Sequence, residues 1–145
     1  MTLATSIDAI YEQIAQQIID AAITGVNGVV LSRELKNGTT HPPYIHIFLD
    51  AGPVEDIVVG LGEHWRLRYT LMAVTQPWAD ADAGQARDIA LQAASAIITD
   101  RGLNSTANQD TVRLAFDPNH TRELDDDILF GAAVTLETRT ILHLT

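Results

Sequence analysis

Five histidines are the side chains of this chain that most readily suggest chemistry, because imidazole can bind a metal or transfer a proton. No two of them stand four residues apart, as ligands on one helix face do, and no HExxH motif occurs. A metal site or catalytic pocket would therefore have to bring His46, Asp50 and His64 together across neighbouring strands. We keep that arrangement as an alternative. The histidines are His41, His46, His64, His120 and His143.

Other catalytic and nucleotide-binding patterns have no match in the sequence. The 145 residues include no cysteine, which excludes disulfides, thiolate zinc sites and cysteine nucleophiles. Gly60-Leu61-Gly62 resembles the start of a dinucleotide-binding loop, but Trp65 stands where the third glycine belongs. Acidic runs such as Asp125-Asp126-Asp127 are typical of solvated loops. We therefore expect no catalytic residue, no cofactor and no metal.

The charge of the chain argues against nucleic-acid binding. Nine Lys and Arg residues against 19 Asp and Glu residues give a net charge of -10, which repels phosphate backbones. Arg66 and Arg68 stand out because they lie two residues apart, on one face of an extended segment. They belong either to an ordinary exposed sheet face or to a contact with acidic groups of a neighbouring copy.

The apolar content permits two interpretations. The chain is 46% hydrophobic and its mean hydropathy is +0.06, which indicates either apolar surface buried between subunits or a well-filled core. No apolar run approaches the roughly 20 residues that span a bilayer. The length suits a single domain.

Hydrophobic periodicity predicts two helices and a series of strands. One helix begins at Thr5 or Ser6 and ends at Gly25, and a second runs from Asp80 or Asp82 to Thr99. Alternation of apolar and polar residues predicts a central strand and a long closing strand. The predicted strands cover residues 29–34, 44–49, 55–61, 65–75, 111–116 and 128–145.

Turn signals connect these elements. Asn37-Gly38 predicts an antiparallel hairpin, and Asp117-Pro118-Asn119 predicts a turn followed by a polar crossing segment. The closing strand is far longer than the usual five or six residues, so we expect it to offer backbone to a partner. The predicted class is α+β, with a mostly antiparallel sheet of four to five strands and two helices packed on one face.

The order of the predicted elements and the residue pattern within them resemble the tail terminator (tail completion) proteins of long-tailed bacteriophages. The resemblance spans nearly the whole chain. The matching features are the helix Ser6–Thr24, the Asn37-Gly38 region, the strand Trp65–Thr75, the alanine-rich helix Asp82–Thr99 and the closing segment Ile128–Thr140.

The resemblance implies a structural role without catalysis. The chain resembles the members of this family, which are small α+β subunits that form a hexameric ring at the head-proximal end of the tail tube. The ring stops tube polymerisation and presents the head-joining surface. The implied partners are other copies, the tail tube protein and a head-tail connector, with DNA passing through unbound and no membrane contact. The implied location is the virion tail or neck, assembled in the host bacterial cytoplasm.

On this resemblance we assign candidate residues to three roles. Arg66, Arg68, Glu137 and Arg139 are candidates for subunit contacts. Asp125, Asp126 and Asp127, with Asp117 and Glu123, are candidates for lining the channel, and Lys36, Asn37 and Asn108 for touching the tube or connector. The alternatives are another head-tail connector, such as a head completion or stopper subunit, and a small ligand-binding protein or enzyme that uses His46, Asp50 and His64.

Overall fold

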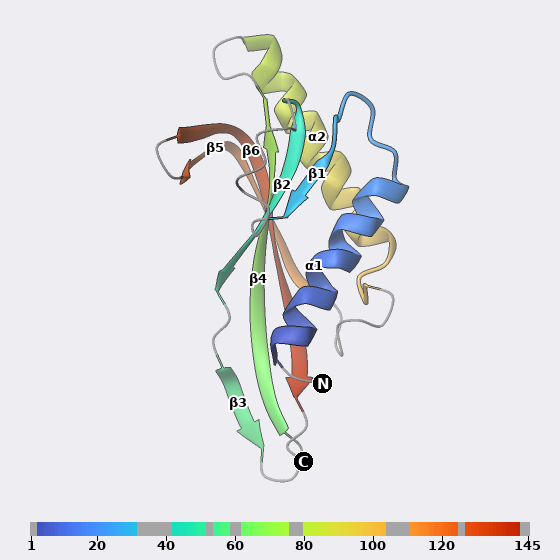
Figure 1. Ribbon diagram of the computed structural model, residues 1–145, viewed down its shortest axis with the longest axis vertical. Helices are drawn as coiled ribbons and strands as arrows, with labels where there is room; N and C mark the ends of the chain where they lie inside the picture. Colours follow the sequence, from blue (N-terminus) through green and yellow to red (C-terminus); the bar gives the residue numbers. More distant parts are fainter. Residues whose placement is uncertain are drawn as a thin grey trace.

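The computed structural model describes residues 3–31, 42–51, 54–58, 62–75, 80–103, 111–124 and 127–142. They form two layers, a sheet and a pair of helices that pack on one of its faces (Figure 1). The predicted α+β class and the mostly antiparallel sheet are confirmed. Five strands form a continuous path, and a sixth pairs beside it.

Helix α1 (Leu3–Asp20) forms where apolar residues recur every three or four positions. Its Ile10, Ile14 and Ile18 side chains are at most 2% exposed. The predicted end at Gly25 is too late, because the helix ends at Asp20 and Ala22 already has a left-handed φ of 50°. Gly25, with a φ of 85°, serves the reversal that follows.

Helix α2 (Asp80–Thr99) occupies the predicted range. It buries Ala86, Ala90 and Ala93 together with Ile89 and Ile97. Since three of these five side chains are single methyl groups, the helix backbone can lie close to the sheet.

The sheet has the strand order β1-β2-β4-β6-β5, and β3 pairs with β4 next to the end of β2. Every pair is antiparallel except β1 with β2. The strands are β1 (Val29–Leu31), β2 (Tyr44–Ala51), β3 (Val54–Val58), β4 (Gly62–Val74), β5 (Thr111–Leu124) and β6 (Asp127–Leu142).

Strand β1 runs parallel to β2, which corrects the predicted hairpin through Asn37-Gly38. The amide of Ile45 donates to the Gly28 carbonyl at 3.0 Å, so the start of β2 lies beside the start of β1. Pro42-Pro43 has no amide hydrogen to donate and could not have continued an antiparallel ladder at this point. Asn37-Gly38 itself lies outside the described residues.

Strand β6 lies inside the sheet, which corrects the prediction that the closing strand offers its backbone to a partner. Strand β4 pairs with residues 131–142, and β5 pairs with residues 127–138. Residues 131–138 are therefore hydrogen-bonded on both edges. The strand is long because both neighbours are long, and the outer strand at this end of the sheet is β5.

Strand β5 continues through Asp117-Pro118-Asn119, where the sequence predicted a turn. The register shifts between Asp117, opposite Ala133, and His120, opposite Gly131, so three steps along β5 match two along β6. This count defines a β-bulge. Pro118 is tolerated because β5 is an edge strand and its missing amide falls at the bulge. Residues 120–124 then pair with the start of β6 and do not form a crossing segment.

The main core lies between the helices and one face of the sheet. Tyr69 of β4 is fully buried there, and its ring meets Tyr11 of α1 edge to face with 5.0 Å between the centroids. The Tyr69 hydroxyl donates to the carbonyl of Ile7 at 3.3 Å, which ties the start of α1 to the sheet. The opposite face, here called the open face, carries a smaller apolar cluster of Phe48, Met72, Val74 and Ala133.

Candidate interaction site on the open face of the sheet

Beside this small cluster, the open face carries a groove of about 420 Å³, lined mostly by residues with charged or polar side chains. The groove spans β2, β4, β6 and β5, whose residues on this face stand side by side in register. Its ionisable lining residues are Asp50, Arg68, Arg113, His120, Arg122 and Glu137.

The bulge in β5 decides which side chains reach the groove. Before the bulge, Arg113 and Ala115 lie on the open face, opposite Glu137 and Thr135. Because one extra residue is inserted, His120 and Arg122 also lie on the open face. In a regular strand, even-numbered residues would have pointed to the helix side.

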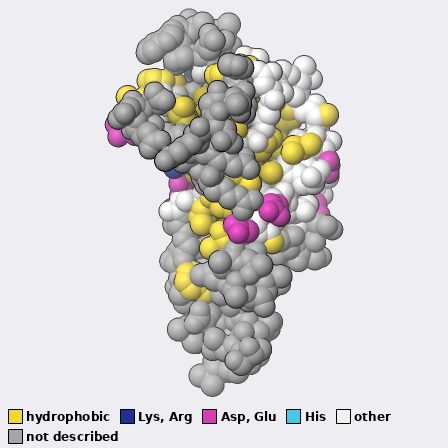
Figure 2. All heavy atoms as spheres, viewed as in Figure 1, with side chains coloured by type: hydrophobic (Ala, Val, Ile, Leu, Met, Phe, Trp, Pro, Cys, Tyr) yellow, Lys and Arg dark blue, Asp and Glu magenta, His cyan; other side chains and the backbone are white. Residues whose placement is uncertain are grey.

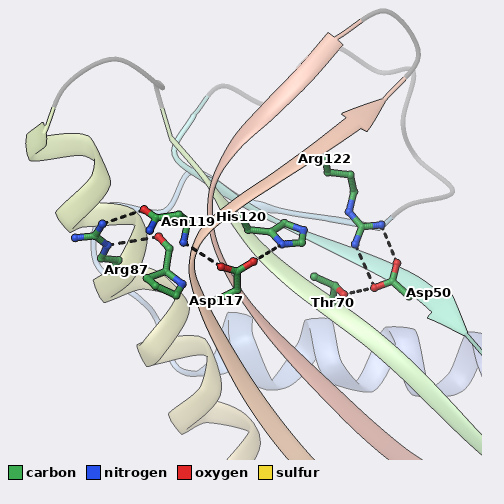
Figure 3. A network of polar contacts seen from close by, with 8 residues as sticks. Asp50, Thr70, Arg87, Asp117, Asn119, His120 and Arg122 are labelled. Atoms are coloured by element: carbon green, nitrogen blue, oxygen red, sulfur yellow. Dashed lines mark hydrogen bonds and ion pairs between the residues drawn. The ribbon is translucent and has the colours of Figure 1, made fainter.

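Contacts from two elements hold the bulge in place (Figure 3). Within β5, the amide of Asn119 donates to Asp117 Oδ1 at 3.1 Å, and His120 Nδ1 lies 3.0 Å from Asp117 Oδ2. From α2, Arg87 donates to the Pro118 carbonyl at 3.4 Å and to Asn119 Oδ1 at 3.0 Å. The helix layer therefore helps to fix the point at which β5 changes its facing pattern.

Arg122 and Asp50 form a two-pronged ion pair that joins β5 to β2 (Figure 3). Arg122 Nη1 lies 2.7 Å from Asp50 Oδ1, and Nη2 lies 3.1 Å from Oδ2. Thr70 also donates to this carboxylate, and the Arg122 Cζ lies 4.1 Å from the centroid of the Phe48 ring. Burial alone would raise the pKa of Asp50, but the hydrogen bonds from Arg122 and Thr70 and the charge of Arg122 lower it below its usual value.

Glu137 lies at the centre of a row of charges across three strands. It stands opposite Arg68 of β4 and Arg113 of β5. Arg68 donates to Glu137 Oε1 from Nη2 at 2.7 Å and from Nε at 3.2 Å, and Arg66 Nε lies 3.8 Å from Oε2. The hydrogen bond from Arg68, helped by the charges of Arg66 and Arg113, lowers the pKa of Glu137 although its burial opposes this.

These contacts place the predicted pair Arg66 and Arg68 on one face, as expected, and show that both meet an acid of the same chain. The Glu137 side chain is only 8% exposed, whereas those of Arg66 and Arg68 are 36% and 49% exposed. Arg113 is exposed, and its guanidinium makes no hydrogen bond within the described part of the chain. We call Arg66, Arg68, Arg113 and Arg122 the arginine face.

The structure does not bring together His46, Asp50 and His64, the grouping kept as an alternative. His46 pairs with Met72, and His64 lies eight residues before Met72 on the same strand, roughly 26 Å away at about 3.3 Å per residue. Asp50 is bound to Arg122 instead. Within the described ranges, no group of three His, Asp or Glu side chains is placed to hold a metal ion.

His46 is a core residue of the open face. It is 3% exposed and stacks on Phe48 with 4.1 Å between the centroids, and neither ring nitrogen has a hydrogen-bond partner among the described residues. Burial, with the nearby charge of Arg122, lowers the pKa of His46 to about 4. Asp50 follows Phe48 on the same face, so Phe48 lies between this neutral imidazole and the Arg122 guanidinium.

The remaining candidates from the sequence are only partly placed. Arg139 stands opposite Arg66 in the β4–β6 ladder and Asp127 begins β6, but their side chains are not described. Asp117 and Glu123 are exposed on β5. Sequence reasoning overlooked Arg113 and Arg122. The candidates outside the described residues are Lys36, Asn37, Asn108, Asp125 and Asp126.

No family model matches the chain, and no curated protein matches it. Among the described helices, neither has the length and apolar character needed to cross a membrane.

Proposed function

We propose that this chain is a structural subunit of a bacteriophage tail, a tail terminator that forms a ring at the head-proximal end of the tail tube. The observation that carries the proposal is the difference between the two sides of the sheet. Helices cover one side, and the arginine face and its groove occupy the other. Copies that meet through two unlike surfaces make a heterologous contact, which closes into a ring when the rotation between copies permits it.

The edges of the sheet support the same proposal. The strand order ends in the three-residue β1 on one side and the fourteen-residue β5 on the other. Phe116 of β5 is 43% exposed and lies on this edge strand. Strand addition to β5 is therefore a route for a neighbour to bind, in place of the closing strand suggested by the sequence. The bulge divides this edge into two shorter stretches.

Other segments take their proposed roles from the resemblance. Asp125 and Asp126 stand between β5 and β6 in the sequence and Asp127 begins β6. These three would line the channel, where their charge repels DNA as it passes. Lys36, Asn37 and Asn108 would contact the tube protein or the head-tail connector. The ring would end tube growth and present the surface that joins the head, and its location would be the virion neck.

Two observations bear on the alternatives. A stopper or head completion subunit is expected to consist mainly of strands, so the two long helices favour a terminator. The enzyme or ligand-binding alternative puts His46, Asp50 and His64 in one pocket, and the strand register separates His46 from His64.

Tube assembly in vitro tests the proposal. The tail tube protein encoded in the same genome is polymerised with and without this protein, and tube lengths are measured in negative-stain images. We expect shorter tubes with added density at one end. Adding the protein after polymerisation is the internal control, because it should cap tubes without shortening them. Unchanged lengths together with bare ends would overturn the proposal.

A further inference from the structure

The exposed side of α1 carries an acidic stripe, defined here as Asp8, Glu12 and Asp20. Asp8 and Glu12 are four residues apart, Gln16 and Asp20 follow at the same spacing, and all four are exposed. Each four-residue step advances about 40° around the helix, so the stripe winds about a third of a turn over the roughly 18 Å from Asp8 to Asp20. Acidic side chains are visible over α1 in Figure 2.

The arginine face is positive within a strongly acidic protein. It holds four of the nine Lys and Arg residues of the chain, and among the described side chains the carboxylates of Asp50 and Glu137 form ion pairs with it. Each guanidinium has five donors, and the hydrogen bonds from this face to Glu137 come from Arg68 alone among the described contacts. Arg113 is exposed and makes no hydrogen bond among the described residues.

The acidic stripe and the arginine face cannot meet within one molecule. Helix α1 packs on one side of the sheet, and the arginine face lies on the other. Their dimensions agree, since Arg68 and Arg113 are two strands apart, roughly 10 Å, which is about the width of a helix. A second copy of this chain supplies a surface of the required charge and shape.

We propose that the acidic stripe of one copy docks on the arginine face of the next, with carboxylates of α1 bonded to Arg113 and Arg68. This contact deepens the proposed ring and rests on it, because the two surfaces are different and the contact is heterologous. Partly desolvated ion pairs across the contact would fix the angle between neighbours and make association depend on salt.

Sedimentation velocity of the full chain, at low and high salt, tests the docking through two charge reversals. Arg113→Glu reverses the arginine face, and its control Arg101→Glu makes the same charge change at an exposed residue just after α2. Glu12→Arg reverses the stripe, and its control is Asp88→Arg on the exposed side of α2. Circular dichroism checks that every variant is folded.

We expect the wild type to self-associate, and less at high salt. Arg113→Glu and Glu12→Arg should each weaken the association at least tenfold, about 1.4 kcal/mol, while the controls change it less than about threefold. An equimolar mixture of the two reversed variants should associate again, because each supplies the surface that complements the other.

Three results would overturn the docking contact. They are a wild type that stays monomeric, reversals no worse than their controls, and a mixture that fails to associate. A DNA duplex that binds the wild type but not Arg113→Glu would also overturn it, because phosphate would then occupy the arginine face. Any of these results leaves the terminator proposal to be judged by the tube assay, in which capping does not depend on where the subunits touch.

Discussion

Breaking the Arg122–Asp50 ion pair should remove the side-chain contact that joins the second half of β5 to β2 across the open face. We expect Arg122→Met, which keeps the length of the side chain but removes its charge, to destabilise the fold by about 2 kcal/mol. The side chains of the pair are 24% and 25% exposed. A surface ion pair contributes roughly 0.2–1 kcal/mol to stability, and breaking a fully buried pair costs roughly 3–5 kcal/mol. The half-buried pair Arg122–Asp50 lies between these limits, so its loss should cost roughly 1.5 kcal/mol. Loss of the contact with Phe48 adds about 0.5 kcal/mol.

A double-mutant cycle measured by urea unfolding at pH 7 separates these contributions. The four proteins are the wild type, Arg122→Met, Asp50→Asn and the double variant, and the coupling between the two sites should be about 1.5 kcal/mol. Arg66→Met is the matched control, because its side chain is more exposed and its contact with Glu137 is 3.8 Å long. Its effect should be under about 0.5 kcal/mol. A coupling below about 0.3 kcal/mol would refute the argument that the bulge brings Arg122 onto the open face to hold β5.

Two further predictions concern the sheet and its buried histidine. A Cβ on Gly131 would lie 1.8 Å from the carbonyl oxygen of Ala73, so Gly131→Ala should lower the free energy of unfolding by about 3 kcal/mol or more. A Cβ on Gly84 would have no atom within 4 Å, so Gly84→Ala should raise the free energy of unfolding by about 0.5–1 kcal/mol. Equal melting temperatures for these two variants would contradict the close packing of β4 on β6. The pKa of His46 is about 4 in the folded chain and 6.5 ordinarily, so protonation favours the unfolded chain. The stability that depends on a neutral His46 is complete above about pH 6.5. As the pH falls from 6.5 towards 4, the free energy of unfolding should decrease by up to about 3 kcal/mol. His46→Phe should remove this part of the pH dependence in urea titrations, and an unchanged curve would show that His46 is not buried as a neutral ring.

The local elements could be predicted because their signals are short in range. The alanines of α2 repeat with the helical period, and residues 65–74 of β4 alternate cleanly, so both elements were found within a few residues of their observed bounds. Arg66 and Arg68 were correctly placed on one face for the same reason. The period of two is fixed by the backbone alone.

What could not be predicted depends on pairing between distant segments. Strand β6 has the same alternation whether it lies at an edge or in the middle of the sheet. The sequence pattern therefore could not predict that β6 is a central strand. The parallel pairing of β1 with β2 likewise depends on contacts across a connection, against the strong hairpin signal of Asn37-Gly38.

Arg66, Arg68 and Glu137 were predicted as site residues, but Arg122 was missed because Pro118 was interpreted as a turn. A proline can instead mark a bulge in an edge strand, and that interpretation of Pro118 would have extended β5 to Leu124. It would also have brought Arg122 onto the same face as Arg113. The signal was present, but only the partner strand decides between the two interpretations.

The mass of the assembled particle tests the central claim most directly, that copies of this chain associate into a closed ring. Native mass spectrometry is performed on the protein alone and on the protein recovered from capped tail tubes. The account predicts a hexamer, six chains of 15.8 kDa or about 95 kDa, in at least the second sample. A single 15.8 kDa species in both samples would contradict it.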